Sequence, residues 1–308
     1  MRYLVTGGAG FIGSHIVHTL AMQGHDVVVL DNFSTGKREN LTGLNGRVEV
    51  VEGTIEDAAT CARAAKGADY VFHEAALVSV PQSMAEPERT HDVNLGGTLN
   101  VLRAAADAGA KRLVFASTSA VYGRTEPPLE EARAGDPLSP YAATKLAGEY
   151  YLRMFASAYA LPTVALRYFN VFGPRQSADG GYAAVIPKFV EAAVAGRRPT
   201  IFGDGTAVRD FVYVGDVVRA NLLACEASAA VGEAINIGSG SHTTVLELRQ
   251  LIFDMVGSDV APEFRPPRPG DIHTSIAVVD KARAVLGFTP RTTLADGLRD
   301  TVAYFRTR

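Results

Sequence analysis

The stretch "TGGAGFIGSH" (residues 6–15) follows a short apolar run and opens the apolar-periodic segment Phe11–Gln23. Its glycines Gly7, Gly10 and Gly13 form a G-x-x-G-x-x-G pattern. Glycines at these positions permit a tight turn and let backbone N–H groups and a helix N-terminus approach a pyrophosphate. Glycine-rich turns also serve simple packing, but a glycine turn between a strand and a helix favours dinucleotide binding.

Strand-like and helix-like segments alternate through the first half of the chain. The expected strands are Tyr3–Thr6, Val27–Leu30, Val48–Glu52, Tyr70–His73, Leu113–Ala116 and Val164–Tyr168, with an expected helix at Leu95–Ala108. Near-continuous apolar strands in such an alternation are typical of a parallel sheet covered by helices on both faces.

The pattern changes after Asn170. Pro, Gly and Arg become frequent and the elements shorten, which indicates a smaller second lobe. The stretch Arg209–Ala224 has the pattern of a strand followed by a helix and could return the chain to the main sheet. We therefore expect a dinucleotide-binding domain at 1–170 with a return segment at about 209–236, and a second lobe at 171–208 and 237–308.

The composition is that of an ordinary folded enzyme, with 47% apolar and 20% charged residues among 308. A net charge of −3 without a long basic block argues against nucleic acid as a partner. No apolar stretch approaches the roughly 18 residues of a membrane span, and the N-terminal residues do not resemble a signal peptide. Cys61 and Cys225 match no metal-binding spacing. We therefore expect no metal, no membrane partner and a location in the reducing cytoplasm.

Asp31 follows the second expected strand, at the place where a carboxylate binds the 2′-hydroxyl of an adenosine ribose. A carboxylate would repel the 2′-phosphate of NADP, so the sequence favours NAD. Lys37 and Arg38 are cations that could accept such a phosphate. We interpret them as solvated loop charges.

Two residues of the stretch "SPYAATKLAGE" (residues 139–149) are candidates for acid–base chemistry. Ser139 can cap a helix, and Pro140 suits the first helical position. Tyr141 and Lys145 lie four residues apart and therefore share one helix face. They are either an exposed aromatic beside a solvated cation, or a phenol whose pKa the neighbouring ammonium lowers so that it can exchange protons.

The stretch "VFASTSAVYG" (residues 114–123) ends an expected strand in the hydroxyls Ser117, Thr118 and Ser119. Hydroxyls at strand ends often only form turns. The carboxyl edge of a parallel sheet, however, is where doubly wound folds bind ligands. A hydroxyl, a tyrosine and a lysine beside a bound dinucleotide would form a proton relay next to a hydride acceptor.

Together these motifs resemble those of the extended short-chain dehydrogenase/reductase superfamily, and more narrowly those of the nucleotide-sugar 4-epimerases, the UDP-glucose and UDP-N-acetylglucosamine 4-epimerase group. The similarity runs from "VTGGAGFIGSH" through "LRYFNVFGPRQ" and "DGTAVRDFVYV" to "RPGD" and "DGLRDTVAYF". It implies an α/β fold: a Rossmann-type doubly wound parallel sheet with a smaller mixed α/β substrate-binding lobe. It also implies NAD as the cofactor, a UDP-sugar substrate, and a homodimer formed through helices near 95–108 and 141–158.

The resemblance also implies the roles of individual residues. Tyr141 would take the proton of the sugar 4-hydroxyl, Lys145 would hold the nicotinamide ribose and lower the tyrosine pKa, and Thr118 would be the catalytic hydroxyl. The implied NAD-lining residues, besides Tyr141 and Lys145, are Gly7, Gly10, Phe11, Ile12, Gly13, Asp31, Asn32, Thr54, Ile55, Ala75, Ala76 and Asn94. Thr54 stands where the family usually has Asp, so one adenine contact departs from the pattern.

The substrate end is assigned in the same way. The implied substrate-binding residues, besides Thr118, are Asn170 for the sugar or its phosphate, Phe202 beside the uracil, Arg209 and Arg268 for the diphosphate, Asp271 for the uridine ribose, and Ser275. Ser275 would border the 2-substituent of the sugar, where a small side chain leaves room for an acetamido group. It could alternatively face solvent.

The resemblance implies inversion at C4 of UDP-hexoses through a 4-keto intermediate, on UDP-GlcNAc and UDP-GalNAc as well as UDP-Glc and UDP-Gal. A strict UDP-glucose 4-epimerase, a UDP-glucuronate epimerase or decarboxylase, and a non-catalytic NAD-binding regulator remain as alternatives. A 4,6-dehydratase is disfavoured because Ser119 and Ala120 stand where that enzyme carries Asp and Glu.

Overall fold

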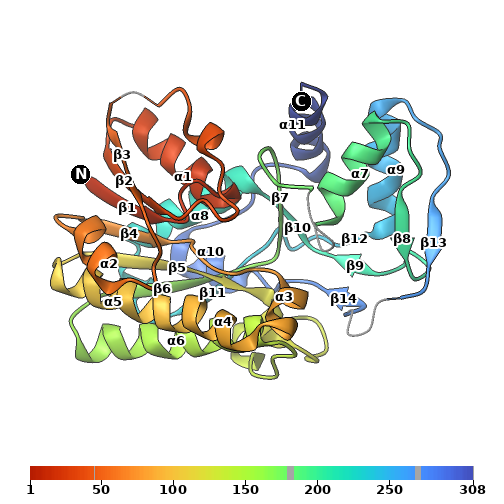
Figure 1. The fold of residues 1–308 in the computed structure, drawn as a ribbon. Helices are drawn as coiled ribbons and strands as arrows, with labels where there is room; N and C mark the ends of the chain where they lie inside the picture. The colour runs from red at the N-terminus through yellow and green to blue at the C-terminus, as the bar shows by residue number, and fades with distance from the viewer. Residues whose placement is uncertain (45, 179–183, 268–271, 308) are drawn as a thin grey trace.

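A seven-stranded sheet forms the core of the larger lobe of the computed structural model, which describes residues 1–44, 46–178, 184–267 and 272–307 (Figure 1). The strands in chain order are β1 Arg2–Thr6, β2 Asp26–Asp31, β3 Val48–Glu52, β4 Tyr70–His73, β5 Arg112–Thr118, β6 Thr163–Tyr168 and β11 Ala234–Ile237. Their spatial order is β11-β6-β5-β4-β1-β2-β3, and every neighbouring pair is parallel. The order reverses between β1 and β4, which is the arrangement of a Rossmann-type doubly wound sheet. The predicted fold class is confirmed.

Helices cover both faces of this sheet. One face is covered by α1 Phe11–Met22, α8 Val214–Glu226 and α10 Asp280–Leu286, and the other by α2 Ala58–Ala65, α5 Gly97–Asp107 and α6 Pro140–Ala158. Because side chains alternate along a strand, Tyr3 and Val5 pack with the first group of helices, whereas Leu4 packs with the second. Burial on both sides explains why the strands are apolar almost throughout.

The second lobe is a mixed α/β layer beside the carboxyl edge of the sheet (Figure 1). Its helices are α7 Val185–Val194, α9 Val245–Val256 and α11 Leu294–Arg306. Its short strands are β7 Asn170–Phe172, β8 Thr200–Phe202, β9 Val208–Arg209, β10 Phe211–Tyr213, β12 Thr243–Thr244, β13 Glu263–Arg265 and β14 Thr274–Ser275, and they pair as β10-β7, β12-β9-β14 and β13-β8. The three helices share a separate apolar cluster that includes Phe189, Phe253 and Leu298.

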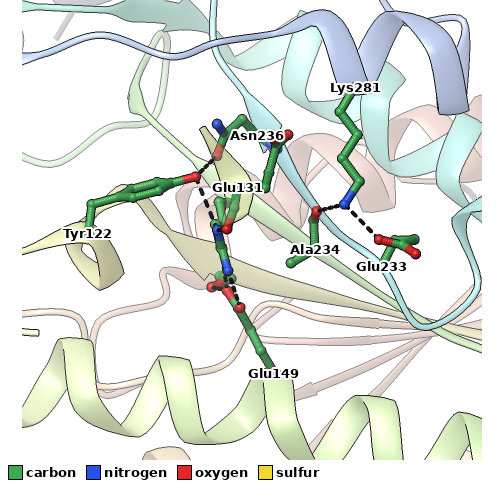
Figure 2. Close-up of polar contacts among 9 residues, drawn as sticks. Tyr122, Glu131, Glu149, Glu233, Ala234, Asn236 and Lys281 are labelled. Carbon is green, nitrogen blue, oxygen red and sulfur yellow. Dashed lines mark hydrogen bonds and ion pairs between the residues drawn. The ribbon is translucent and has the colours of Figure 1, made fainter. Parts of the chain in front are cut away.

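The return of the chain to the main sheet differs in detail from the prediction. The strand expected within Arg209–Ala224 is β10, and it pairs with β7 outside the main sheet. The returning elements are α8, which packs on the sheet, and β11, which pairs with β6. Lys281 of α10 fastens β11 by donating to the carbonyl of Ala234 at 2.9 Å (Figure 2). The division into domains stays a prediction.

The expected helix Leu95–Ala108 begins later than the sequence pattern indicates. A single π-helical turn, η2 Asp92–Gly96, precedes α5 and follows α3 Val80–Ala85 and α4 Pro87–His91. Turns of this kind are frequent at functional sites. The remaining short helical turns are η1 Arg38–Leu41, η3 Ser119–Tyr122, η4 Glu131–Arg133 and η5 Ser228–Ala230. Within the described ranges, no helix is both long enough and apolar enough to cross a membrane.

Candidate active site

The glycine turn joins β1 to α1 in a conformation that requires glycine. Gly7 has φ +67°, and a Cβ on it would lie 2.7 Å from the backbone nitrogen of Ala75. A Cβ on Gly13 would lie 2.2 Å from the carbonyl oxygen of Gly7. Gly10 is the N-cap of α1 and supplies no side-chain cap, so its absent side chain leaves the helix N-terminus open to a phosphate group. This turn fits a dinucleotide pyrophosphate.

Asp31 ends β2 beside this turn and is 7% exposed. One carboxylate oxygen accepts from the backbone N–H of Ala9 at 2.9 Å, and the other accepts from that of Phe33 at 2.8 Å. Each oxygen keeps further acceptor capacity, so Asp31 can brace the glycine turn and still bind ribose hydroxyls. Arg38 pairs with Glu52 and lies over the Phe33 ring, which agrees with a solvated loop charge.

The other predicted cofactor residues gather at the same edge, since the carboxyl ends of parallel strands meet there. Asn32 is exposed after β2, and its side chain accepts from the N–H of Ser34. Thr54 and the buried Ile55 follow β3, Ala75 and Ala76 follow β4, and Phe11 and Ile12 begin α1. The Thr54 hydroxyl donates to Glu56 at 2.8 Å. NAD contacts by these residues stay predictions.

Asn94, in η2, uses its side chain to bind the protein itself. Its side-chain oxygen accepts from the backbone N–H of Leu77 at 2.7 Å, and its side-chain nitrogen donates to the carbonyl of Leu77 at 3.0 Å. The same nitrogen donates to the Thr144 hydroxyl at 3.3 Å. The π-helical turn therefore fastens the loop after β4 to α6. This positioning role is one that the sequence did not indicate.

The predicted catalytic residues come from β5 and α6. Ser139 caps α6 by accepting from the N–H of Ala142 at 3.2 Å, with Pro140 at the first position as predicted. Thr118 is the last residue of β5, and its side chain is hydrogen-bonded to the phenol of Tyr141. The structure therefore brings the hydroxyl and the phenol into contact at the carboxyl edge of the sheet.

Lys145 lies one helical turn after Tyr141 and is 3% exposed. Its ammonium donates to the carbonyl of Ala116 at 2.8 Å and lies 4.5 Å from the centre of the Phe115 ring. Burial lowers the pKa of Lys145 to about 8, while the charge of Glu74 opposes this change. The lysine is thus anchored to the strand that carries Thr118.

The expectation that Lys145 lowers the pKa of Tyr141 is wrong for the polypeptide alone. Burial raises the pKa of Tyr141, the hydrogen bond with Thr118 lowers it, and the charge of Glu74 raises it further. The cost of removing a phenolate from water is the dominant cause. Burial and Glu74 therefore hold Tyr141 in its phenol form.

Glu74 is a site residue that the sequence reasoning missed. It follows β4 directly, and its carboxylate accepts a hydrogen bond from the Tyr168 hydroxyl at 2.9 Å. Burial raises the pKa of Glu74 to about 7. An acidic residue at the end of the buried strand "YVFH" was the signal that could have found it.

A buried ion pair behind the catalytic strand was also missed. Glu149 of α6 and Arg167 of β6 form two hydrogen bonds, at 2.9 and 2.7 Å, and both side chains are 3% exposed. The Ser117 hydroxyl donates to the same carboxylate at 2.5 Å. Arg167 also donates to the Tyr122 hydroxyl, which donates to Asn236 of β11 at 2.6 Å (Figure 2). The network joins β5, α6, β6 and β11 directly beside the catalytic residues.

The described residues at the predicted substrate end lie near one another in the second lobe. Arg209 of β9 is paired in register with Ser275 of β14 and donates to the carbonyl of His273 at 3.0 Å. The Asn170 amide donates to the carbonyl of Asp210, the residue after Arg209, at 3.1 Å. Ser275 is 9% exposed, so the alternative that it faces solvent is wrong.

Phe202 ends β8 and is half-buried, and its place beside the uracil stays a prediction. Arg268 and Asp271 lie outside the described residues. In the part of the chain that the structure describes, no His, Cys, Asp and Glu side chains gather as metal ligands would.

The fold and this cluster define a dinucleotide-binding α/β protein with a Thr–Tyr–Lys constellation at the carboxyl edge of its parallel sheet. Residues 3–238 match the model of the NAD dependent epimerase/dehydratase family. The chain belongs to this family, and the prediction of NAD as cofactor is confirmed.

Three similar proteins each match 99% or more of this chain. A UDP-glucose 4-epimerase of Mycolicibacterium smegmatis is 42% identical over 100% of this chain and 99% of its own. A structure of a Thermotoga maritima UDP-glucose 4-epimerase with UDP-glucose has a TM-score of 0.94 at 44% identity, covering 100% and 99% of the two chains. A structure of a Methanobrevibacter ruminantium UDP-N-acetylglucosamine 4-epimerase with UDP-N-acetylmuramic acid has a TM-score of 0.95 at 42% identity, covering 99% and 98%.

Proposed function

We propose that this protein is an NAD-dependent UDP-sugar 4-epimerase, which inverts C4 of UDP-hexoses through a 4-keto intermediate. The observation that carries the proposal is the contact between Thr118 and Tyr141 at the sheet edge that also holds the glycine turn. The similarity to two kinds of UDP-sugar 4-epimerase over the whole chain supports it. The non-catalytic regulator is disfavoured, because a protein without chemistry has no need of this contact.

The mechanism uses Tyr141, Thr118 and Lys145 in different ways. When bound, NAD would supply a reversible acceptor for the hydride of the sugar C4. Tyr141 takes the 4-hydroxyl proton and later returns it, and the Thr118 hydroxyl relays that proton and orients the phenol. Lys145 would hold the nicotinamide ribose, and its hydrogen bond to the carbonyl of Ala116 fixes the position of its ammonium. Catalysis requires the phenolate, so charges that stabilise it in the loaded site must offset the effect of burial.

The second lobe would hold the UDP part of the substrate. We assign Arg209 and Arg268 to the diphosphate, because guanidinium groups donate paired hydrogen bonds to phosphate oxygens. Asn170 would bind the sugar or its phosphate, Asp271 the uridine ribose, and Phe202 would border the uracil. The described members lie near one another. Arg209 is paired in register with Ser275 of β14, and the Asn170 amide donates to the backbone carbonyl of Asp210, the residue after Arg209.

For the sugar itself, we propose activity on UDP-GlcNAc and UDP-GalNAc as well as on UDP-Glc and UDP-Gal. Ser275 is small, buried and in register with Arg209, so it can border a bulky 2-substituent without overfilling the site. A strict UDP-glucose 4-epimerase is the second candidate, favoured by the names of two relatives. A UDP-glucuronate epimerase or decarboxylase uses a similar 4-keto intermediate and is the third.

The deciding experiment incubates the purified protein separately with UDP-Glc, UDP-Gal, UDP-GlcNAc and UDP-GalNAc and resolves the products by chromatography. Interconversion within both pairs supports the full proposal, and interconversion of the first pair alone supports the strict enzyme. If none of these four sugars is converted while NAD remains bound, 4-epimerase activity on UDP-hexoses is refuted. UDP-glucuronate in a fifth reaction tests the third candidate.

We also propose that the protein acts in the cytoplasm as a homodimer. Tyr150 and Met154 of α6 are 61% and 40% exposed, and Ala143 is an exposed residue of the same helix. An apolar stripe on a long surface helix suits the matching helix of a second copy. Light scattering measures the mass, and Tyr150→Glu with Met154→Glu should give a monomer.

Cys61 and Cys225 are both free buried thiols, which suits a reducing compartment.

A further inference from the structure

Glu74 lies where three neighbouring strands of the sheet end, and the mechanism above gives it no role. Its backbone N–H donates to the carbonyl of Thr6 in β1, so the hydrogen bonding between β4 and β1 continues to this residue. Its carboxylate bonds Tyr168 of β6, which lies two strands away from β4. The strand that this contact crosses is β5, and Tyr168 is in register with Thr118 of β5. The carboxylate is therefore held beside the end of the catalytic strand.

The partners of Glu74 leave its negative charge only partly compensated. The Tyr168 hydroxyl has one proton, and the Nδ2 of Asn221 in α8 donates to that hydroxyl at 2.8 Å. Both hydrogen bonds form when the Tyr168 hydroxyl accepts from Asn221 and donates its hydrogen bond to Glu74. An ionised carboxylate has about four acceptor positions. Among the described residues, the hydrogen bond from Tyr168 is the one that the Glu74 carboxylate accepts. The Lys145 ammonium donates to the carbonyl of Ala116 rather than to Glu74.

Three titratable groups lie close enough to Glu74 to interact with its charge. Tyr141 and Lys145 come from α6, and Tyr168 comes from β6. Asn221 of α8 is neutral. The charge of Glu74 acts on both members of the Tyr141–Lys145 pair: it disfavours the phenolate and favours the ammonium.

We propose that Glu74 is a positioning residue whose negative charge controls the ionisation of Tyr141 and Lys145. The inference deepens the proposed function and rests on it for the catalytic consequence. When Glu74 is ionised, the pair is held as phenol and ammonium. When Glu74 is neutral, through protonation or substitution, Tyr141 loses its proton more readily. The carboxylate thus sets the pH at which the base of the reaction becomes available.

Two substitutions separate this electrostatic role from a merely structural one. Glu74→Gln removes the charge, but its side-chain carbonyl can still accept the hydrogen bond from Tyr168. Tyr168→Phe removes the hydrogen bond but leaves the carboxylate, which is ionised at the alkaline pH where Tyr141 titrates. A structural role predicts similar effects of both substitutions, whereas the charge predicts an effect of Glu74→Gln alone.

The first measurement is the titration of Tyr141 by ¹⁹F NMR in protein that carries 3-fluorotyrosine, with the signal assigned by Tyr141→Phe. The fluorine lowers the phenol pKa equally in all variants and brings the titration into an accessible range. In Glu74→Gln the Tyr141 midpoint should fall by about 0.5–1.5 units, the scale of one like charge at short range in a part-buried site. In Tyr168→Phe it should stay within about 0.2 units of the wild type.

The second measurement is the pH dependence of turnover with the substrate pair that the wild type accepts. The acidic limb should move to lower pH in Glu74→Gln, since the phenolate then forms at lower pH. Equal Tyr141 midpoints in the wild type and Glu74→Gln, or equal shifts in both variants, would overturn the proposal. Because the NMR titration needs no substrate, it decides this inference even if the epimerase assay fails.

Discussion

Replacing Glu149 by Gln should destabilise the protein strongly, because it leaves the Arg167 charge buried without its counter-ion. Both side chains are 3% exposed, and two hydrogen bonds join them. Breaking one side of such a pair costs about 3–5 kcal/mol. The new amide would also direct N–H groups at either the guanidinium or the Ser117 hydroxyl.

This loss can be expressed as a melting temperature. An unfolding entropy of about 2.1 cal/mol/K per residue gives about 0.65 kcal/mol/K for a chain of 308 residues. A loss of about 3–5 kcal/mol then lowers the melting temperature by roughly 5–8 °C. Differential scanning calorimetry measures it, and urea denaturation checks the free energy independently.

The matched control is Glu52→Gln, which removes the carboxylate of another arginine pair. Glu52 and Arg38 are 62% and 65% exposed, and exposed pairs contribute about 0–1 kcal/mol. The control should therefore shift the melting temperature by less than about 2 °C. If Glu149→Gln shifts it no more than the control does, the ion pair does not stabilise the fold and the reasoning is refuted.

Four further predictions concern the site. Tyr141→Phe should lower turnover by roughly 100-fold or more, the scale of a lost acid–base group, while calorimetry shows unchanged NAD binding; near-normal turnover would contradict its role. Arg209→Ala and Arg268→Ala should each weaken UDP-sugar binding by about 1.5–3 kcal/mol and leave NAD binding nearly unchanged, and equal losses for both ligands would show a wrong assignment. Ser275→Tyr should abolish activity on N-acetylated sugars by overfilling the site and spare UDP-Gal, as product chromatography would show; retained N-acetyl activity would contradict the gate. Burial raises the pKa of Glu74 from 4.5 to about 7, so ionisation of Glu74 costs the folded state stability as pH rises through that window. Urea titrations should find that the free energy of unfolding of Glu74→Gln increases relative to that of the wild type as pH rises between those two values. A difference that does not change with pH would contradict the raised pKa of Glu74.

Local signals in the sequence predicted a large part of the site. The glycine turn, the Ser139 cap and the Tyr141–Lys145 spacing each depend on residues within a few positions of one another, and short-range geometry decides them. The predicted strands also lie where the apolar runs are, because each strand is buried on both faces. The structure confirms these features with boundary shifts of one or two residues.

The missed features depend on partners that are distant in the sequence. Glu149 and Arg167 are 18 residues apart, and Glu74 and Tyr168 are 94 apart. A single sequence gives neither the placement of α6 on β6 nor that of the end of β4 relative to β6, so neither pair could be predicted. The strand β11 was missed because its four residues, "AINI", are too short to show a period. The pKa of Tyr141 in the polypeptide alone was assigned the wrong direction because burial, which outweighs the hydrogen bond with Thr118, was not known.

The place of β11 at the end of the sheet has a consequence for attempts to divide the chain. A fragment that stops at Asn170 would lack both β11 and α8. The loss of β11 would leave the N–H and C=O groups of β6 unpaired along a strand that is buried throughout. The loss of α8 would uncover the apolar side chains of Val114 and Val164. An open apolar strand edge pairs readily with other chains, so such a fragment would aggregate. The cofactor-binding part is therefore not an excisable module, and grafts or split-protein designs must keep residues 214–237 with it.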